Sequence, residues 1–225
     1  MKNIYIFFIL FMDKLKELFY RVRDIPFAFV SGTAFDYRKA IESIETLNKG
    51  SCSAKHFYLG HLYEKEGLDV DYVSYVFFWE DQEYVPNELK NEAKHLPEQF
   101  HLALCLNGRD IDATYDIGLK DLGFPVNEWE NQKISVEYTE KITHKTPQER
   151  ISYTQKRAKG NGNLRRFYQL FNEWIEKNRK KSIYDKTPTN PRRLFKNIEG
   201  NSRRKRGLSN HRPSLQYKSR EQKTC

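Results

Sequence analysis

The stretch Gly50-Ser51-Cys52-Ser53-Ala54-Lys55-His56 places a cysteine where a turn ends and an amphipathic segment begins. In residues 53–66, apolar side chains recur at three- and four-residue steps, namely Ala54, Tyr58, Leu59 and Leu62. Gly67 suits the end of such a helix. Unpaired N–H groups and the helix dipole at a helix start favour the thiolate form of a cysteine. We therefore expect a helix over 53–66 that Cys52 opens.

Residues 100–116 predict a β-hairpin. Asn107-Gly108 lies between two strand-like runs and is typical of a two-residue type I′ loop. This loop pairs Cys105 with Asp110 and His101 with Thr114. Because side chains alternate along a strand, His101 and Asp112 then share one face as diagonal neighbours, with backbones about 7–8 Å apart. One hydrogen bond between imidazole and carboxylate closes that distance.

Neighbouring polar residues offer alternatives to this assignment. Asp110 is nearer the turn and is expected in solvent, and Asp116 lies past the paired region, so Asp112 is the expected partner of His101. His56 follows Cys52 by one helical turn and is a competing base or metal ligand, or else a packed or solvated helix residue, which we favour. Cys105 is expected to pack beneath the helix, with redox sensing as the alternative.

Cysteine, histidine and aspartate together form a nucleophilic unit. A thiolate attacks, an imidazole lowers the thiol pKa and protonates the leaving amine, and a carboxylate orients the imidazole. The backbone N–H of Cys52 is a natural oxyanion donor. The alternative is that none of the three is catalytic. Cys52 would then be a buried structural thiol, His101 a strand residue with its hydrogen bonds made, and Asp112 a residue that stabilises the hairpin.

The order of these elements resembles the transglutaminase-like superfamily. The cysteine stretch is followed by a helix ending near Gly67, a strand, His101, and then Asp112-Ala113-Thr114-Tyr115, where that family usually has Asp-Pro-Thr-Trp. The resemblance covers about residues 35–116. It implies a papain-like α+β core with the cysteine helix on an antiparallel sheet, and Cys52, His101 and Asp112 as nucleophile, base and orienter.

The same resemblance implies an enzyme that acts on the amide bond of a peptide or protein. It favours hydrolysis of that bond over a cross-linking acyl transfer. Tyr115 would be a wall beside the triad by analogy with the family. Trp79, at the end of an apolar run, is either a wall of the substrate cleft or a core residue, and the second is favoured. No calcium-loop pattern is present, so we predict neither a metal nor a cofactor.

The remaining chain shows weaker patterns. Helical spacing predicts helices at 13–23, 35–47, 88–94, 147–156 and 164–178, and β-branched and aromatic runs predict strands at 70–79 and 133–138. The second helix has candidate core residues Phe35, Tyr37, Ile41, Ile44 and Leu47. We divide the chain into an apolar N-terminal extension (1–12), a catalytic domain (13–140), C-terminal helices (141–182) and a disordered basic tail (183–225).

Charge is distributed unevenly along the 225 residues. Residues 1–150 carry 18 basic and 25 acidic side chains, whereas the net charge of +9 comes from the last third of the chain. The run Arg203-Arg204-Lys205-Arg206 could bind phosphate backbones, but it contains no aromatic residues that would stack on bases. We expect solvated disorder there, and nucleic-acid association through this tail is an alternative function, as is a non-catalytic binding module.

Cysteine usage and the N-terminus bear on location. Three cysteines without a Cys-x-x-Cys pair argue against a disulfide framework and a structural zinc site, and favour a reducing cytoplasm. The apolar run from Ile4 to Met12 is too short to span a bilayer and lacks a signal-peptide cleavage pattern. Met12 is an alternative start. Oligomeric state and the exact substrate are left open by the sequence.

Overall fold

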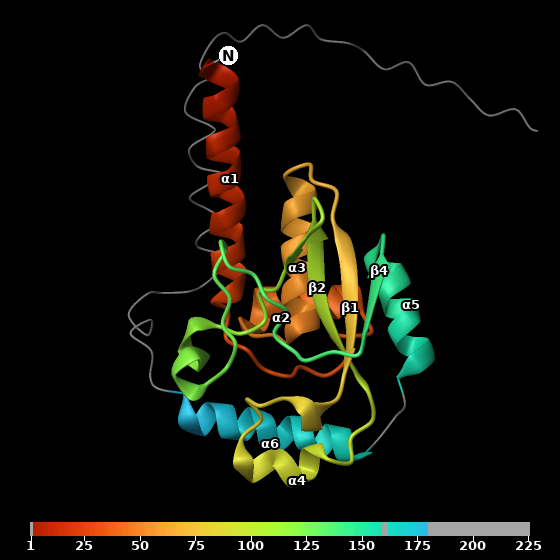
Figure 1. Cartoon of the computed structure of the whole chain (residues 1–225). Coiled ribbons are helices and arrows are strands. Elements are labelled where there is room, and N and C mark those ends of the chain that lie inside the picture. Colours follow the sequence, from red (N-terminus) through yellow and green to blue (C-terminus); the bar gives the residue numbers. More distant parts are fainter. Residues whose placement is uncertain (1, 159–161, 180–225) are drawn as a thin grey trace, which may run out of the picture. The chain divides into compact units, whose positions relative to one another are not determined.

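A computed structural model of the chain describes residues 2–158 and 162–179 (Figure 1). These residues form a four-stranded antiparallel sheet with helices packed on it, so the α+β class is confirmed. The strand order is β3-β2-β1-β4. The strands are β1 (Asp71–Phe77), β2 (Gln99–Leu106), β3 (Arg109–Ile111) and β4 (Glu140–His144).

Six α-helices and three short 3₁₀ segments complete the described part of the chain. The helices are α1 (Lys2–Arg23), α2 (Tyr37–Leu47), α3 (Cys52–Lys65), α4 (Lys90–Ala93), α5 (Pro147–Arg157) and α6 (Gly162–Asn178). The 3₁₀ segments are η1 (Trp79–Asp81), η2 (Asn87–Leu89) and η3 (Ile117–Leu122). In Figure 1, α3 lies beside β2, α5 lies next to β4, and α4 and α6 lie together at one end of the sheet.

Alternation along the strands gives the sheet two buried faces. Leu102 and Leu104 pack in one apolar cluster with α1, α2 and α3. Ala103 belongs to a second cluster, which Phe167 and Phe171 of α6 also enter. His101 alternates with Leu102, so it lies on the face opposite the body of α3. The helix therefore meets His101 near its N-terminal end, where the ring centroid of His56 lies 6.0 Å from that of His101.

Helix α3 is buried almost throughout. The predicted stripe of Ala54, Tyr58, Leu59 and Leu62 is in the core, as expected. Lys55 and His56 are also fully buried, which the amphipathic pattern does not predict. Gly67 ends the helix with a φ of 82°, and the N–H of Leu68 donates to the carbonyl of Tyr63.

The hairpin register is confirmed, although its second strand is shorter than predicted. Cys105 pairs with Asp110, and Asn107 and Gly108 both have positive φ, as a type I′ loop requires. Pairing stops at Ile111, so Thr114 does not pair with His101. The next backbone N–H groups bind side chains instead: Asp112 donates to Gln132, and Ala113 donates to His56.

Other sequence predictions are corrected. Residues 133–138 form no strand, because the N–H groups of Lys133, Ser135 and Glu137 donate to side chains rather than to a neighbouring strand. Phe35 and Leu47 are 42% and 53% exposed and are not core residues. Asp36 caps α2, which leaves Phe35 outside the helix.

Helix α1 continues from Lys2 through the boundary proposed at residue 12. Among the described residues, no helix is both long and apolar enough to cross a membrane. The tail predicted from residue 183, including Arg203–Arg206, lies outside the described residues.

Gly50 precedes the cysteine in a position where a side chain does not fit. A Cβ there would lie 2.7 Å from Ile44 Cδ1 and 2.8 Å from Ala54 Cβ. We expect Gly50→Ala to lower the free energy of unfolding by about 1–3 kcal/mol through overpacking, measured by urea denaturation. Gly162→Ala is the control, since a Cβ there meets nothing within 4 Å. Equal stability of the two variants would contradict this account of the turn.

Candidate active site

Cys52 is the first residue of α3 and is half-buried. The turn before it is fixed by backbone hydrogen bonds: Gly50 N–H donates to the carbonyl of Pro26, and Ala28 N–H donates to the carbonyl of Gly50. Ser51 has an extended conformation and its side chain does not cap the helix. The thiol therefore lies beside helical N–H groups that this residue leaves uncapped, and their partial positive charge favours a thiolate.

His101 and Asp112 form the pair that the hairpin predicts. Nε2 of His101 lies 2.9 Å from Oδ2 of Asp112, and the two residues are only 2% and 1% exposed. The imidazole is oriented by this hydrogen bond, which uses Nε2 and leaves Nδ1 for another partner. Burial strengthens the interaction because little water screens it.

Asp112 is held by several further donors. The backbone N–H of Ser135 donates to Oδ2 at 2.8 Å, and that of Thr114 donates to Oδ1 at 3.1 Å. Burial alone would raise the pKa of this carboxyl, but the charge and hydrogen bond of His101 hold it far below its usual range. Asp112 is thus a fixed negative charge in the interior.

Cys52 and His101 shift each other's pKa. Burial by itself raises the pKa of the Cys52 thiol, yet the hydrogen bond and charge of His101 outweigh it, so the net pKa lies below the ordinary value. Burial likewise lowers the pKa of His101, whereas Asp112 and Cys52 raise it, to about 10. Both shifts favour a thiolate–imidazolium pair at neutral pH.

His56 ties the cysteine helix to the aspartate segment. Its Nδ1 lies 2.8 Å from the carbonyl of Cys52, and the N–H of Ala113 donates to Nε2 at 2.8 Å. Nε2 must therefore be unprotonated, and Nδ1–H donates to the carbonyl. Full burial lowers the pKa of His56 to about 4, with Asp112 opposing the shift, so the ring is neutral. This arrangement agrees with the favoured prediction that His56 is a packed helix residue. It does not agree with the alternative that His56 is a competing base.

Lys55 makes a second polar connection between α3 and the rest of the chain, one that the sequence does not predict. Its buried Nζ donates to the carbonyls of Arg23, Ile25 and Thr114, at 2.6, 2.9 and 2.7 Å. Burial lowers its pKa to about 7, against the raising effect of Asp116. The contacts join α3 to the end of α1 and to the chain after Asp112.

The other candidate residues have separate places. Asp110 is half-buried rather than solvated, and it accepts hydrogen bonds from Tyr75 at 2.6 Å and Lys141 at 2.7 Å. Asp116 is buried and accepts from the N–H of Phe27 at 2.8 Å. Cys105 is half-buried and packs on the α6 side of the sheet, not beneath α3 as predicted. None of them joins the Cys52–His101–Asp112 arrangement.

A small cavity of about 40 Å³ is lined in part by Cys52 and His101. Its other walls are mostly aromatic and include both residues predicted as cleft walls, Trp79 and Tyr115. The remaining lining residues are Phe27, Phe29, Phe77, Gln99, Phe100, Thr114, Val136 and Tyr168. Trp79 and Tyr115 are each 3% exposed and are core residues, which is the alternative favoured for Trp79, and their role as walls of a substrate cleft stays a prediction.

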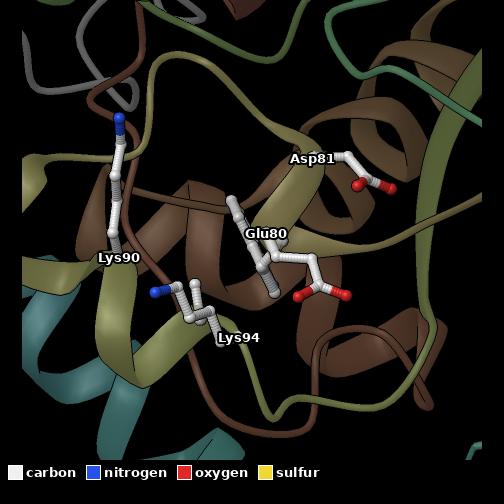
Figure 2. Close-up of a pocket in the computed structure, with 6 residues that line it drawn as sticks. Glu80, Asp81, Lys90 and Lys94 are labelled. Carbon is white, nitrogen blue, oxygen red and sulfur yellow. The ribbon is translucent and has the colours of Figure 1, made fainter.

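A larger cavity of about 250 Å³ lies on another side of Trp79. Glu80 and Asp81 of η1 and Lys90 and Lys94 of the α4 region line it. Figure 2 shows the carboxylates pointing to one side and the ammonium groups to the other. These charges do not converge on one point. Within the described residues, no group of three or more His, Cys, Asp or Glu side chains could hold a metal ion.

Comparison of the chain with models of protein families, with curated proteins and with solved structures finds no match. The site is thus defined by its geometry. Sequence reasoning missed the two ties made by Lys55 and His56. Their one local signal is that these two polar residues stand between Ala54 and the apolar run Phe57-Tyr58-Leu59.

The neutral state of His56 makes stability depend on pH. Because its folded pKa of about 4 lies below the ordinary histidine pKa of 6.5, its contribution to stability is present above pH 6.5 and is lost as the pH falls toward 4. We expect the stability advantage of wild type over His56→Gln to shrink by about 2–3 kcal/mol between pH 7 and pH 4.5, in urea denaturation.

The control for this measurement is His95→Gln, which removes an exposed histidine. The free energy of unfolding of that variant should equal that of wild type at both pH values. If wild type and His56→Gln lost the same free energy of unfolding between pH 7 and pH 4.5, His56 would not be held neutral in the folded protein.

Proposed function

We propose that this protein is a cysteine enzyme of the transglutaminase-like type that acts on amide bonds, with Cys52, His101 and Asp112 as its triad. The observation that carries the proposal is the buried contact of His101 with Asp112 at 2.9 Å, beside a thiol at a helix start. A thiol, an imidazole and a carboxylate are the groups that such a reaction uses as nucleophile, base and orienter. The lowered pKa of the thiol and the raised pKa of the imidazole support the same roles.

In the first half-reaction, the Cys52 thiolate attacks the amide carbonyl carbon. The developing oxyanion accepts a hydrogen bond from the backbone N–H of Cys52. The C–N bond then breaks as His101, protonated at Nδ1, gives its proton to the leaving amine. A thioester on Cys52 and a neutral imidazole result, and Asp112 holds the ring in place throughout.

In the second half-reaction, neutral His101 removes a proton from water, which attacks the thioester. The carboxylic acid leaves and the thiolate–imidazolium pair is restored. The cavity beside Cys52 has room for a water molecule and little more, which favours water over a lysine side chain as acyl acceptor. Hydroxyl oxygen Oγ1 of Thr114 is buried there without a hydrogen-bond partner and could bind the substrate amide.

An acyl-amide probe panel tests the proposal. We expect wild type to accumulate a thioester adduct on Cys52, seen as a mass increase of the intact protein, and to hydrolyse the best probe. Cys52→Ala should form no adduct, whereas Cys105→Ala should behave as wild type. Labelling that persists in Cys52→Ala would refute the nucleophile.

The role of Asp112 has its own test. We expect Asp112→Asn to lower kcat on that probe by about 10³-fold or more, because an amide neither fixes the imidazole tautomer nor stabilises its charged form. Asp110→Asn is the matched control on the same hairpin and should stay within a few-fold of wild type. A similar loss in both variants would show that hairpin structure, not the triad, limits activity.

A further inference from the structure

Arg150 of α5 is completely buried, although arginine is among the residues that proteins most often expose. Its guanidinium donates to the carbonyl of Ala34 at 2.8 Å and to that of Phe100 at 3.4 Å. The remaining nitrogen, Nε, is buried without a hydrogen-bond partner. Two neutral carbonyls do not neutralise a permanent positive charge, and one of the three guanidinium nitrogens has no hydrogen-bond partner.

In the described part of the chain, no carboxylate forms an ion pair with Arg150. Among the residues that the structure describes, the ion pairs of Asp and Glu side chains involve other cations, and none includes Arg150. A buried ion without a partner costs several kcal/mol in free energy. A neighbouring anion of another kind is therefore expected.

Arg150 lies against the residues around Cys52. Its guanidinium carbon is 5.6 Å from the ring centroid of Phe57, which follows Cys52 on α3. Phe100, whose carbonyl it binds, precedes His101 and lines the cavity beside Cys52. Full burial lowers the pKa of Arg150 to about 10, and the one charged group that opposes this shift is the Cys52 thiolate.

The other titratable groups near the pair do not offer a second anion. His144 of β4 lies near Arg150, and burial holds its pKa below the usual value, so it is neutral at pH 7. The tyrosines that interact with Cys52 have raised pKa values through burial and are also neutral, namely Tyr84, Tyr115 and Tyr168. His101 is the other cation facing the thiolate, and Asp112 is already paired with it.

We infer that Arg150 is the second cation of the active site, a buried guanidinium whose counter-ion is the Cys52 thiolate. Unlike His101, it does not give up its proton, so its charge persists through both half-reactions. When the thioester is hydrolysed, the thiolate leaves beside both the imidazolium that His101 has become and the permanent charge of Arg150. This inference rests on the thiolate of the proposed function but not on its amide substrate.

The pH dependence of Cys52 alkylation by iodoacetamide tests this role without any substrate. Wild type, Arg150→Gln and Arg150→Lys are labelled over a pH range, and modification of the Cys52 peptide is quantified by mass spectrometry. We expect Arg150→Gln to move the midpoint upward by about one pH unit, a tenfold loss of thiolate below the midpoint. Arg150→Lys keeps the charge and should keep most of the wild-type midpoint.

Matched controls separate charge from packing. Arg157→Gln removes a partly exposed arginine of the same helix, which pairs with Glu98 and Glu140, and should leave the midpoint unchanged. Circular dichroism and urea denaturation establish that each variant is folded, and Arg150→Met is a second uncharged variant should Arg150→Gln not fold. An equal upward shift in Arg150→Lys and the uncharged variant would overturn the inference, because packing rather than charge would then set the midpoint.

His101→Ala distinguishes failure of this inference from failure of the proposed function. A midpoint that rises in His101→Ala but not in the uncharged Arg150 variant leaves the triad standing and removes Arg150 from it. A wild-type midpoint equal to that of free cysteine overturns both. If the midpoint rises both in His101→Ala and in the uncharged Arg150 variant, two cations stabilise one thiolate.

Discussion

The buried carboxylate of Asp112 is the constraint on which the site depends. A charge in the interior is tolerated only when hydrogen bonds and opposite charges surround it. Here two backbone N–H groups and an imidazole supply them, from Ser135, Thr114 and His101. Meeting these demands ends strand β3 at Ile111 and gives residues 133–138 a conformation without strand pairing. The local structure follows the charge rather than the strand propensity of the sequence.

The cysteine is brought to this carboxylate by two polar ties from a single helical turn. His56 joins the carbonyl of Cys52 to the N–H of Ala113, and Lys55 reaches the carbonyl of Thr114. Apolar packing of α3 on the sheet fixes the distance between the layers, but it leaves freedom to slide and rotate. Directional bonds at both ends of the Asp112 segment remove that freedom, which a site with angstrom tolerances requires.

Much of this arrangement could be predicted from local pattern. Asn107-Gly108 specifies the hairpin register through its need for positive φ, and that register places His101 near Asp112. The helix start at Cys52 follows from Gly50 and the apolar stripe after it. The predicted contacts were those between residues close in sequence or joined by a tight turn.

Long-range polar contacts could not be predicted in this way. The strand expected at 133–138 fails because its N–H groups bind side chains far away in the sequence, such as Gln82 and Asp112. Arg150 belongs to a helix that looks solvated by composition, and nothing in its neighbourhood marks it as buried. Periodicity reports which face of an element is apolar. It carries no information on which polar group a folded chain will bury.

A non-catalytic binding module is the natural competitor, and the charges of the site argue against it. Replacing a buried ion pair by apolar residues of similar volume is often neutral or stabilising, so fold stability alone does not require one. The chain nevertheless buries an aspartate, a histidine with a raised pKa and an arginine without a carboxylate partner around one thiol of lowered pKa. The positive charges of His101 and Arg150 lower the free energy of the thiolate rather than that of the neutral thiol, and Asp112 keeps His101 in its charged form. A surface that only bound a partner would gain nothing from that preference, whereas a nucleophile depends on it.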